Sequence, residues 1–354
     1  MKNINKNFLS SKEIPIDEFI SNVLYDESHG YYSKKIPFGK NGDFITAPEI
    51  SFLFGEVLAI WVVSFWEHLD KPKNFNIIEL GPGNGLLSKI LVKTFKKFPE
   101  FFDSSKMYLY EKSKKLKEVQ KKLLYKEDIK WIQNFNSIKK GPVLFLGNEF
   151  FDAIPIKQYE VKKNIVYERF VTLNKNQKIK YLLRKIDKKI LRQLKELNLL
   201  KGQTFIEYPK QGLDELKKLI KKIKKYSGGI LLVDYGFLKQ ESKNTMQSVK
   251  NHKKNNLFDN LGNADITSLV NFNLLEKYFK REKLKVNKTV TQAKFLKRMG
   301  IINRANIVSQ KMNFKEKSSI YLSLQRLLHP KYMGDLFKVI FACKSKKKFS
   351  LGFD

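Results

Sequence analysis

Four residues suited to a ligand site lie close together in "IIELGPGNGLLSKIL", residues 77–91. Glu79 ends an apolar run, and Gly81, Gly83 and Gly85 separate it from a helical pattern. A dinucleotide-binding loop reads G-x-G-x-x-G, but here the last glycine comes one residue early. Glycines let the main chain approach a ribose and an amino-acid tail closely, and a carboxylate can hold an ammonium group. These features favour an adenine nucleoside with a cationic tail, S-adenosylmethionine (SAM), over a pyrophosphate.

A second carboxylate, Glu111, ends the next apolar run, "MYLYE". An acid at the end of the second strand of a nucleotide-binding fold can accept hydrogen bonds from both ribose hydroxyls. Taken alone, the glycine loop could be a tight turn and Glu111 a surface charge, but together they favour SAM. Trp131 could stack on the adenine, although packing in the core explains this residue equally well.

A third group, Asn148, Glu149 and Asp152, lies in "GNEFFDAIP" after another apolar run. Two carboxylates and an amide beside a methyl donor would suit a guanidinium, which pairs bidentately with carboxylates. A guanidinium keeps its proton near neutral pH, so alignment and carboxylate contact must compensate. In the structural alternative, Asn148 forms a turn and Asp152 caps a helix.

The elements around these residues alternate between strand and helix. We expect strands at 74–80, 107–111 and 142–150, and helices at 84–98 and 113–125. This alternation predicts right-handed parallel crossovers and therefore a layered α/β domain. Ligands of such sheets bind at the carboxyl ends of the strands, where all three groups would meet.

The alternation is interrupted after residue 156. We expect an antiparallel hairpin within 157–183, turning at an Asn-Lys-Asn-Gln sequence, then a helix at 187–199 and a strand near "TFIEYP". The later elements are expected as follows: helix 213–225, strand "ILLVDYG", a long loop at 239–264, a helix capped by Asp265, strand 284–290, helix 304–328 and strand "LFKVIFACK".

The N-terminal part, 1–72, is predicted to hold helices and a lid loop, and 73–354 a second domain with an insertion at about 157–204. Residues 13–26 form an amphipathic pattern. The loop 29–51 brings Asp43 and Thr46 into an otherwise apolar segment, which favours a functional role. Residues 50–69 are apolar and near membrane length, but Glu56 lies inside them, so a buried helix is expected.

Composition restricts the class of protein. The 354 residues include 69 Lys and Arg against 35 Asp and Glu, a net charge of +34. Only seven of the 69 are arginine, and the lysines are spread along the chain, so a compositional bias explains the charge better than nucleic-acid binding. Cys343 is the only cysteine, which excludes a disulfide framework and a cysteine zinc site. We expect no metal, no secretory signal and a reducing compartment, the cytoplasm or, in a eukaryote, the mitochondrial matrix.

Segments along nearly the whole chain, from about residue 13 to 343, resemble the MidA family of class I SAM-dependent methyltransferases. They are, in order, "GYYSKKIPFGKNGDFITAPEISFLFGEVLAIW", "IELGPGNG", "GNEFFDAIPIKQY", "VDYG", "GNADITSLVNF", "TQAKFLKRMGI" and "RLLHPKYMGDLFKV". The first and third blocks are highly specific, whereas the glycine loop alone indicates only a methyltransferase.

The resemblance implies a Rossmann-like, seven-stranded, mostly parallel sheet with inserted elements and with SAM at the first two strand ends. In mitochondrial members it implies dimethylation of an arginine in a complex I subunit and a role in assembly of that complex. When the family's residue roles are transferred to this sequence, the resemblance implies that Glu79 and the three glycines form the donor loop and that Glu111 holds the ribose. On the acceptor side it implies Asn148, Glu149 and Asp152. Asp43, Thr46 and Pro48 belong to a segment that closes over the donor.

The sequence departs from the family at several positions. Asn84 and Leu86 stand where Arg and Thr are common, and Leu269 and Asn271 replace a His and an Asp of many members. Three alternatives therefore stay open: another protein side chain or a small molecule as acceptor, an assembly factor that binds SAM without turnover, and nucleic-acid methylation. The assembly state is also open, with a homodimer as one option.

Overall fold

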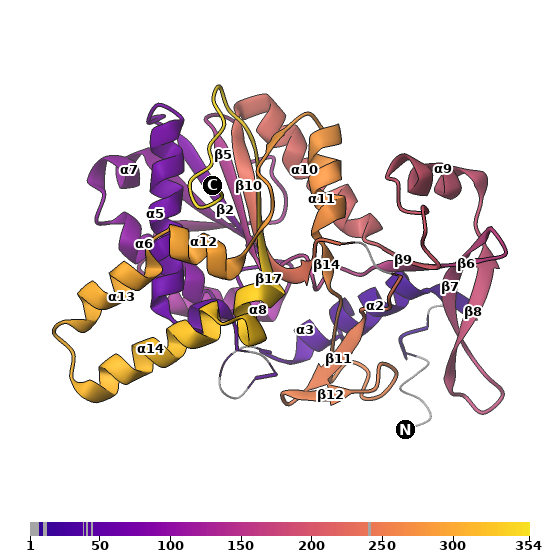
Figure 1. Ribbon diagram of the computed structural model, residues 1–354. Helices are drawn as coiled ribbons and strands as arrows, with labels where there is room; N and C mark the ends of the chain where they lie inside the picture. The colour runs from indigo at the N-terminus through magenta and orange to yellow at the C-terminus, as the bar shows by residue number, and fades with distance from the viewer. Residues whose placement is uncertain (1–6, 10–12, 38, 40–41, 44, 240–241) are drawn as a thin grey trace.

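The computed structural model describes residues 7–9, 13–37, 39, 42–43, 45–239 and 242–354. Seven strands follow one another across its central sheet (Figure 1). In spatial order they are β15 (Lys285–Val286), β17 (Phe337–Lys344), β10 (Gly228–Phe237), β5 (Val143–Asn148), β2 (Phe75–Leu80), β3 (Ser105–Tyr110) and β4 (Ile129–Ile132). Two short strands, β14 (Val270–Asn271) and β16 (Val290–Thr291), pair with β10 and β17.

Most of this sheet is parallel. Strands β4, β3, β2, β5 and β10 pair in parallel, and β17 runs antiparallel to β10 and to β15. All six residues of β2 are buried, as expected for a strand that is covered by helices on both faces. The predicted α/β fold with a mostly parallel, Rossmann-like sheet is therefore confirmed.

Helices cover the sheet on two sides. One apolar core joins the sheet to α5 (Phe52–His68), α6 (Leu86–Phe95), α7 (Pro99–Ser104), α12 (Gln292–Arg298), α13 (Ile301–Ser309) and α14 (Phe314–Leu328). A second core joins it to α9 (Lys188–Glu196), α10 (Lys210–Tyr226) and α11 (Phe272–Arg281). Helix α8 (Lys114–Leu123) follows β3, and the π-helical turn η1 (Pro330–Gly334) precedes β17.

Helix α5 is the apolar segment of near-membrane length. Its Trp61, Phe65 and Trp66 are buried against the sheet and the chain end, while Glu56 pairs with Arg304 at 2.9 Å. The buried-helix prediction is correct. Among the helices of the described residues, none combines the length and the hydropathy that crossing a membrane requires.

The N-terminal segment packs beside the carboxyl ends of the central strands. It contains β1 (Glu13–Pro15), α2 (Ile16–Tyr25), α3 (Tyr31–Lys34) and α4 (Ala47–Ile50). Of the predicted lid loop 29–51, residues 38, 40–41 and 44 lie outside the described residues. The insertion holds three strands where we predicted two: β6 (Lys157–Lys162), β7 (Ile165–Leu173) and β8 (Ile179–Lys185). The predicted hairpin corresponds to β7 and β8, and β6 is the additional strand; with β1 and β9 (Phe205–Tyr208) the three form a five-stranded sheet.

Two predictions between residues 239 and 281 are wrong. The expected loop contains β11 (Gln247–Lys250) and β12 (Lys253–Asn255), which form a three-stranded sheet with β13 (Asp265–Thr267). Asp265 therefore lies in a strand and does not cap a helix. The N-cap of helix α11 is Asn271, six residues later, whose side chain accepts a hydrogen bond from the Leu274 amide at 3.0 Å. Pairing with β11, distant in sequence, overrides the local capping signal of Asp265.

The C-terminal elements are also shorter than predicted. The expected strand 284–290 is two short strands, β15 and β16, and the expected helix 304–328 is α13 and α14 with a break at residues 310–313. Asn313 starts the second helix with a capping box, because its side chain bonds the Glu316 amide and Glu316 bonds back.

Candidate functional site

The register of the sheet brings three loops to one edge. Leu80 at the end of β2 lies opposite Tyr110 of β3 and Gly147 of β5. The residues that follow these positions, Gly81, Glu111 and Asn148, therefore lie side by side at this edge, where β5 ends at Asn148. This is the crevice at the strand ends in which parallel α/β sheets bind ligands.

The glycine loop has a backbone that few other residues could adopt. Gly81, Gly83 and Gly85 have φ angles of 61°, 56° and 87°, in the left-handed region that glycine enters without strain. A Cβ atom on Gly81 would lie 3.0 Å from the ring of Phe150. Asn84, where Arg is common in the family, bonds Glu49 at 2.8 Å and accepts from the Leu86 amide at 3.0 Å. The loop is thus held in place and leaves room for a ligand against bare main chain.

Two buried carboxylates flank this loop. Glu79 accepts a short hydrogen bond from the Ser88 hydroxyl, and burial raises its pKa to about 7. Glu111 accepts from the Ser113 amide at 2.8 Å, and burial also raises its pKa. Neither carboxylate forms an ion pair with a basic side chain in the described part of the chain, so both can serve a cationic or hydroxyl-bearing ligand.

Gln120 links the two parts of the donor side, and sequence reasoning missed it. Its amide nitrogen donates to the Gly83 carbonyl at 2.8 Å and to Glu111 at 3.2 Å, while its oxygen accepts from the indole of Trp131 at 2.9 Å. Trp131 does not line the cavity described below, so it supports Gln120 and does not offer a stacking face. Gln120 lies four residues after Leu116 and four before Leu124, on the apolar face of a lysine-rich helix, and this position is the signal that could have indicated its role.

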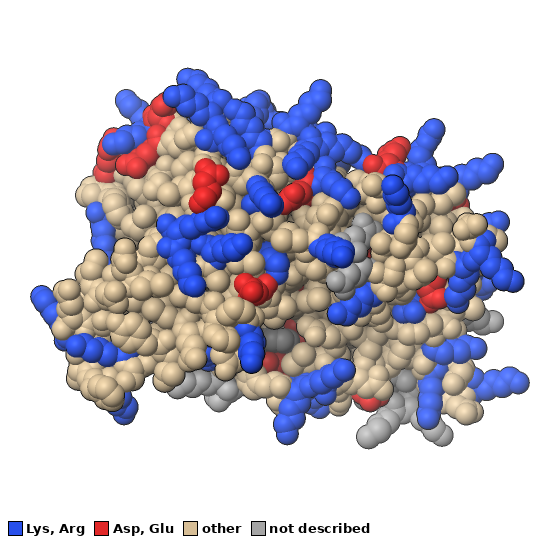
Figure 2. Space-filling view, viewed as in Figure 1, with Lys and Arg blue, Asp and Glu red and all other residues tan. Residues whose placement is uncertain are grey.

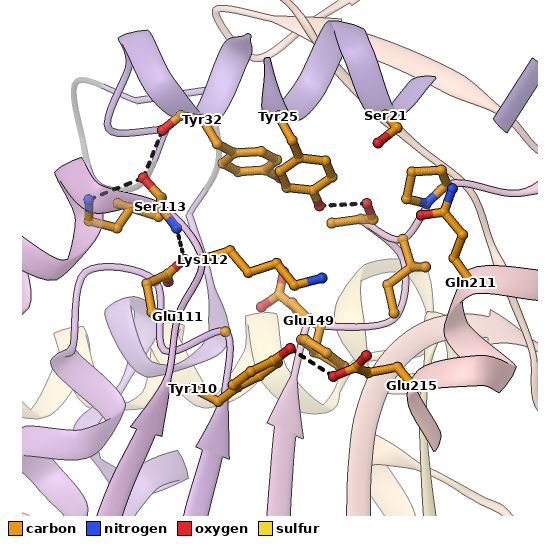
Figure 3. Close-up of a pocket in the computed structure, with 17 residues that line it drawn as sticks. Ser21, Tyr25, Tyr32, Tyr110, Glu111, Lys112, Ser113, Glu149, Gln211 and Glu215 are labelled. Carbon is orange, nitrogen blue, oxygen red and sulfur yellow. Dashed lines mark hydrogen bonds between the residues drawn. The ribbon is translucent and has the colours of Figure 1, made fainter. Parts of the chain in front are cut away.

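A cavity of about 330 Å³ lies in front of these groups (Figure 3). Gly81, Gly83, Glu111 and Glu149 line it from the strand ends. Tyr25 and Tyr32, from α2 and α3, line the opposite side, with ring centroids 5.4 Å apart and planes at 16°. Figure 3 shows both rings facing into the cavity and the Lys112 side chain crossing it.

A smaller cavity of about 30 Å³ adjoins the glycine loop on its other side. It is lined by Thr46 and Pro48 of the predicted closing segment, and by Glu79, Asn148 and Glu149. Asp43 of the same segment lines neither cavity. It is buried where it accepts from the Tyr31 hydroxyl and the Asn251 amide, both at 2.5 Å, and so ties the segment to the small sheet.

The loop after β5 carries the acceptor-side candidates, and Glu149 has the least usual backbone among them. Its φ angle of 52° is in the left-handed region, which is costly for a residue with a side chain and is typical of functional sites. Its carboxylate accepts from Asn148 Nδ2 at 3.2 Å and from the Ala47 amide at 3.4 Å. Burial, followed by the charge of Asp152, raises the pKa of Glu149 to about 8.

Asp152 lies on the same loop and is buried. One oxygen accepts a short hydrogen bond from the Tyr235 hydroxyl. The other, Oδ1, is buried and has no hydrogen-bond partner among the described residues, and the same holds for Asn148 Oδ1. Burial raises the pKa of Asp152 to about 6. No helix of the described residues begins at this position, so the capping alternative is wrong. Asp234 fixes the loop instead, accepting from the amides of Phe151 and Asp152 at 2.8 and 3.1 Å.

Asp265 is a further buried carboxylate that sequence reasoning did not assign to the site. It accepts from the Tyr32 hydroxyl at 3.2 Å, and burial, followed by the charge of Asp152, raises its pKa to about 7. Its position between the apolar residues Ala264 and Ile266 is a signal that could have indicated a buried acid. Glu149, Asp152 and Asp265 therefore form an acidic group with no ion-paired lysine or arginine among the described residues.

The sequence of the chain matches a known family. A family model described as "Putative S-adenosyl-L-methionine-dependent methyltransferase" matches residues 57–290, which is more than half of the chain. The chain belongs to this methyltransferase family. Its methyl donor is accordingly SAM, and the predicted cofactor and enzyme class are confirmed.

Relatives extend the similarity over nearly the whole chain. The mitochondrial protein arginine methyltransferase NDUFAF7 of Xenopus laevis is 29% identical and covers 93% of this chain and 80% of the relative. The human protein of the same name is 27% identical, with coverages of 93% and 79%. A crystal structure from Burkholderia thailandensis, bound to S-adenosyl-homocysteine, superposes with a TM-score of 0.81 at 21% identity, covering 97% of this chain and 89% of that one. At this identity the superposition supports the methyltransferase fold.

The residues at the strand ends fit SAM as a ligand. The bare main chain of Gly81 and Gly83 gives the close approach that a nucleoside needs, and Glu111 stands at the second strand end with capacity for ribose hydroxyls. Glu79 lies behind the loop and lines the smaller cavity, where its carboxylate would suit a cationic tail. When bound, SAM supplies an electrophilic methyl group on a sulfonium sulfur.

Proposed function

We propose that this methyltransferase methylates an arginine side chain of a protein, and that the protein is a subunit of respiratory complex I. The observation that carries the proposal is the acidic group of Glu149, Asp152 and Asp265 beside the donor loop. A guanidinium has five N–H donors and remains charged, which matches carboxylates that lack a basic partner. The printed names of the relatives and the resemblance to the MidA family support arginine as the acceptor.

In this proposal Glu149 and Asp152 orient the guanidinium, and Glu149 also takes up a proton. The methyl group leaves sulfur as the acceptor nitrogen bonds to it, giving S-adenosylhomocysteine, and the nitrogen must lose a proton. A guanidinium beside Glu149 would favour the ionised carboxylate, and the raised pKa of this partly buried group, about 8, then makes it a good proton acceptor. Its left-handed backbone fixes the carboxylate relative to the loop, so alignment does not depend on a flexible side chain alone.

The Glu149→Gln variant tests the proposed chemistry. The amide has nearly the same shape but cannot accept a proton, so turnover should fall about 100- to 10,000-fold. SAM binding, measured by calorimetry, should remain close to wild type, because Glu149 is only one of several residues that line the donor cavity. Undiminished turnover in this variant would reject Glu149 as the base.

The identity of the acceptor is tested in cells. Mass spectrometry of complex I subunits, with and without this protein, should show a methylated arginine that disappears on deletion and does not return with Glu149→Gln. Return of complex assembly with the inactive variant would instead support an assembly factor that binds SAM without turnover. An unchanged methylation state of every subunit would reject complex I as the target and leave other proteins or small guanidines as acceptors.

A further inference from the structure

The donor cavity extends beyond the residues that fit SAM. Those residues lie at one end of it, where Gly83, Glu111 and Ser113 line the wall. The residues of its outer end take no part in that fit: Ser21, Ala153, Ile154, Pro155, Gln211 and Glu215. In Figure 3 the donor end lies to the left and the outer end to the right, with Glu149 between them. The outer end can therefore hold a second ligand beside the donor.

Glu149 connects the outer end with the donor site. Gly81, Gly83 and Glu149 line both the donor cavity and the smaller cavity at Glu79. The sulfur of SAM lies between its ribose and its amino-acid tail. A donor with its ribose at Glu111 and its tail at Glu79 would present this sulfur near the three residues that both cavities share. A ligand in the outer end reaches Glu149 within the same cavity, so no chain segment separates it from these residues.

Apolar groups and an aromatic ring form the walls of the outer end. The Tyr25 hydroxyl of α2 donates to the Ala153 carbonyl at 2.8 Å, which fixes the ring over the loop that follows β5. Ile154 and Pro155 of this loop also line the cavity. Tyr25 and Gln211 are exposed, so the outer end opens to solvent between α2 and α10. Such walls suit the methylene groups of a long side chain, and an aromatic face also stacks on a guanidinium.

Glu215 of α10 places a negative charge in this wall. It is buried and lines the cavity. Burial would raise its pKa, but hydrogen bonds from Lys218 at 2.8 Å and from the Tyr110 hydroxyl at 2.7 Å outweigh burial and lower the pKa. Glu215 is therefore ionised at neutral pH. Because the Lys218 side chain is mostly exposed, solvent weakens its pairing with Glu215, which can still attract a cation into the outer end.

Lys112 already places a cation in the same space. Figure 3 shows its side chain crossing the cavity from the donor end toward the outer end. Its charge contributes to the lowered pKa of Glu215, yet Lys112 forms no ion pair in the part of the chain that the structure describes. The residue as a whole is exposed, so its side chain can turn out to solvent. An acceptor cation in the outer end would take the place of this ammonium group.

We infer that the outer end is the passage for the acceptor arginine, whose guanidinium displaces the Lys112 ammonium on its way to Glu149. The apolar walls would hold the methylene groups, and Glu215 would attract the charged head before it reaches the donor. Lys112 competes with the acceptor for this space and so lowers the affinity for it. This inference rests on the proposed arginine methyltransferase function and adds the route of the acceptor and the residue that limits its access.

Binding of a blocked arginine tests the passage without turnover. Nα-acetyl-arginine methylamide is titrated into protein saturated with S-adenosylhomocysteine, and its dissociation constant is measured by ligand-observed NMR. The citrulline analogue, which has the same shape and no charge, should bind at least about tenfold more weakly, because hydrogen bonds between charged groups are stronger. Lys112→Met should lower the dissociation constant of the arginine probe on the order of fivefold, because it removes the competing charge.

Each charge variant has a matched control outside the cavity. Lys114→Met should match wild type, because Lys114 is exposed, pairs with Glu27 and does not line the cavity. Glu215→Gln should raise the dissociation constant of the arginine probe on the order of fivefold. Asp214→Asn, one position earlier on α10, removes the same charge from an exposed side chain that does not line the cavity, and it should also match wild type.

The two cavity variants are expected to act in opposite directions, so partial unfolding cannot produce both results. Equal dissociation constants for wild type, Lys112→Met and Glu215→Gln would overturn the passage and leave arginine methylation in place. Equal affinity for the arginine and citrulline probes would overturn it as well. If wild-type protein that binds SAM binds neither probe and methylates no complex I subunit, the proposed function fails, and this inference fails with it.

Discussion

At the scale of single residues, the site keeps carboxylates in surroundings that disfavour their charge. Glu79, Glu149, Asp152 and Asp265 all have a raised pKa, and burial is the largest cause in each. Glu149 adds a left-handed backbone to this cost. Proteins keep such unfavourable free energies mainly at functional sites, where ligand binding can offset them. A cationic donor and a cationic acceptor would do so by favouring the charged carboxylates.

The raised pKa of Glu149 predicts how stability depends on pH. The usual pKa is 4.5 and the folded value is about 8. Between these values the folded protein holds a proton that the unfolded chain has released, so the free energy of unfolding falls as pH rises through this range. Glu149→Gln removes this contribution. Urea denaturation of the SAM-free protein at several pH values should show the variant gaining on wild type toward pH 8, and parallel curves would contradict the assignment.

The glycine loop gives a prediction about donor binding. Gly83→Val places a branched side chain where the main chain meets the ligand, so calorimetry should detect no SAM binding. Gly202→Val is the control: its φ of 69° imposes a similar strain, but nothing lies within 4 Å of an added Cβ. That variant should lose stability and still bind SAM. SAM binding by Gly83→Val with wild-type affinity would show that the donor lies elsewhere.

At the scale of elements, local patterns predicted the core strands well and the small sheets poorly. The runs that became β2, β3 and β5 were identifiable because buried parallel strands are continuously apolar. Strand β13 has three residues, too few to show a period, and it depends on pairing with β11. The same limit applies to Asp265 and to Tyr32: sequence shows an acid and an aromatic residue, but only tertiary packing brings them within 3.2 Å.

One ion-paired lysine connects elements that the sequence separates. Lys157 of β6 pairs with Asp17 of α2 at 3.0 Å and with Glu168 of β7 at 2.5 Å, and all three side chains are at most 14% exposed. Lys157→Met would leave two buried carboxylates without a partner and should lower the free energy of unfolding by about 3–5 kcal/mol. Lys162→Met removes a surface pair with Glu160 and should cost at most about 1 kcal/mol. If denaturant titrations gave the same decrease in the free energy of unfolding for both variants, the buried ion pairs would contribute no more than the surface pair.

At the scale of the whole molecule, basic side chains lie mainly on the surface, whereas the site contains a group of carboxylates. Lysine and arginine side chains project over much of the face in Figure 2 and do not gather in one patch, and α13 and α14 carry few of them. Of the site's carboxylates, Glu149 is partly buried, and the others are buried: Glu79, Glu111, Asp152 and Asp265. On this face the basic side chains are dispersed, as the compositional explanation of the net charge predicts, whereas a nucleic-acid interface concentrates its basic groups.

The net charge of +34 predicts a dependence on salt. Repulsion among the lysines disfavours the compact state at low ionic strength. Raising NaCl from about 0.01 M to about 0.15 M shortens the screening length from about 30 Å to about 8 Å. The thermal midpoint should therefore rise by several degrees, whereas an equal osmolality of sucrose provides a control without screening. A midpoint that is unchanged or lower in NaCl would mean that close ion pairs outweigh the general repulsion.

The tyrosine pair over the cavity has a consequence for turnover. The Tyr32 carbonyl accepts from the hydroxyl of Ser113, whose amide bonds Glu111, and the Tyr32 hydroxyl donates to Asp265. The hydroxyl of the stacked Tyr25 donates to the Ala153 carbonyl. In the proposed site Glu111 lies on the donor side and Asp265 on the acceptor side. A donor that orders the two tyrosine rings also orders them for the acceptor, and a bound acceptor orders them for the donor to the same extent, because such coupling is reciprocal. SAM and the acceptor should therefore strengthen each other's binding. When one product dissociates, the rings become less ordered, and the other product should dissociate faster.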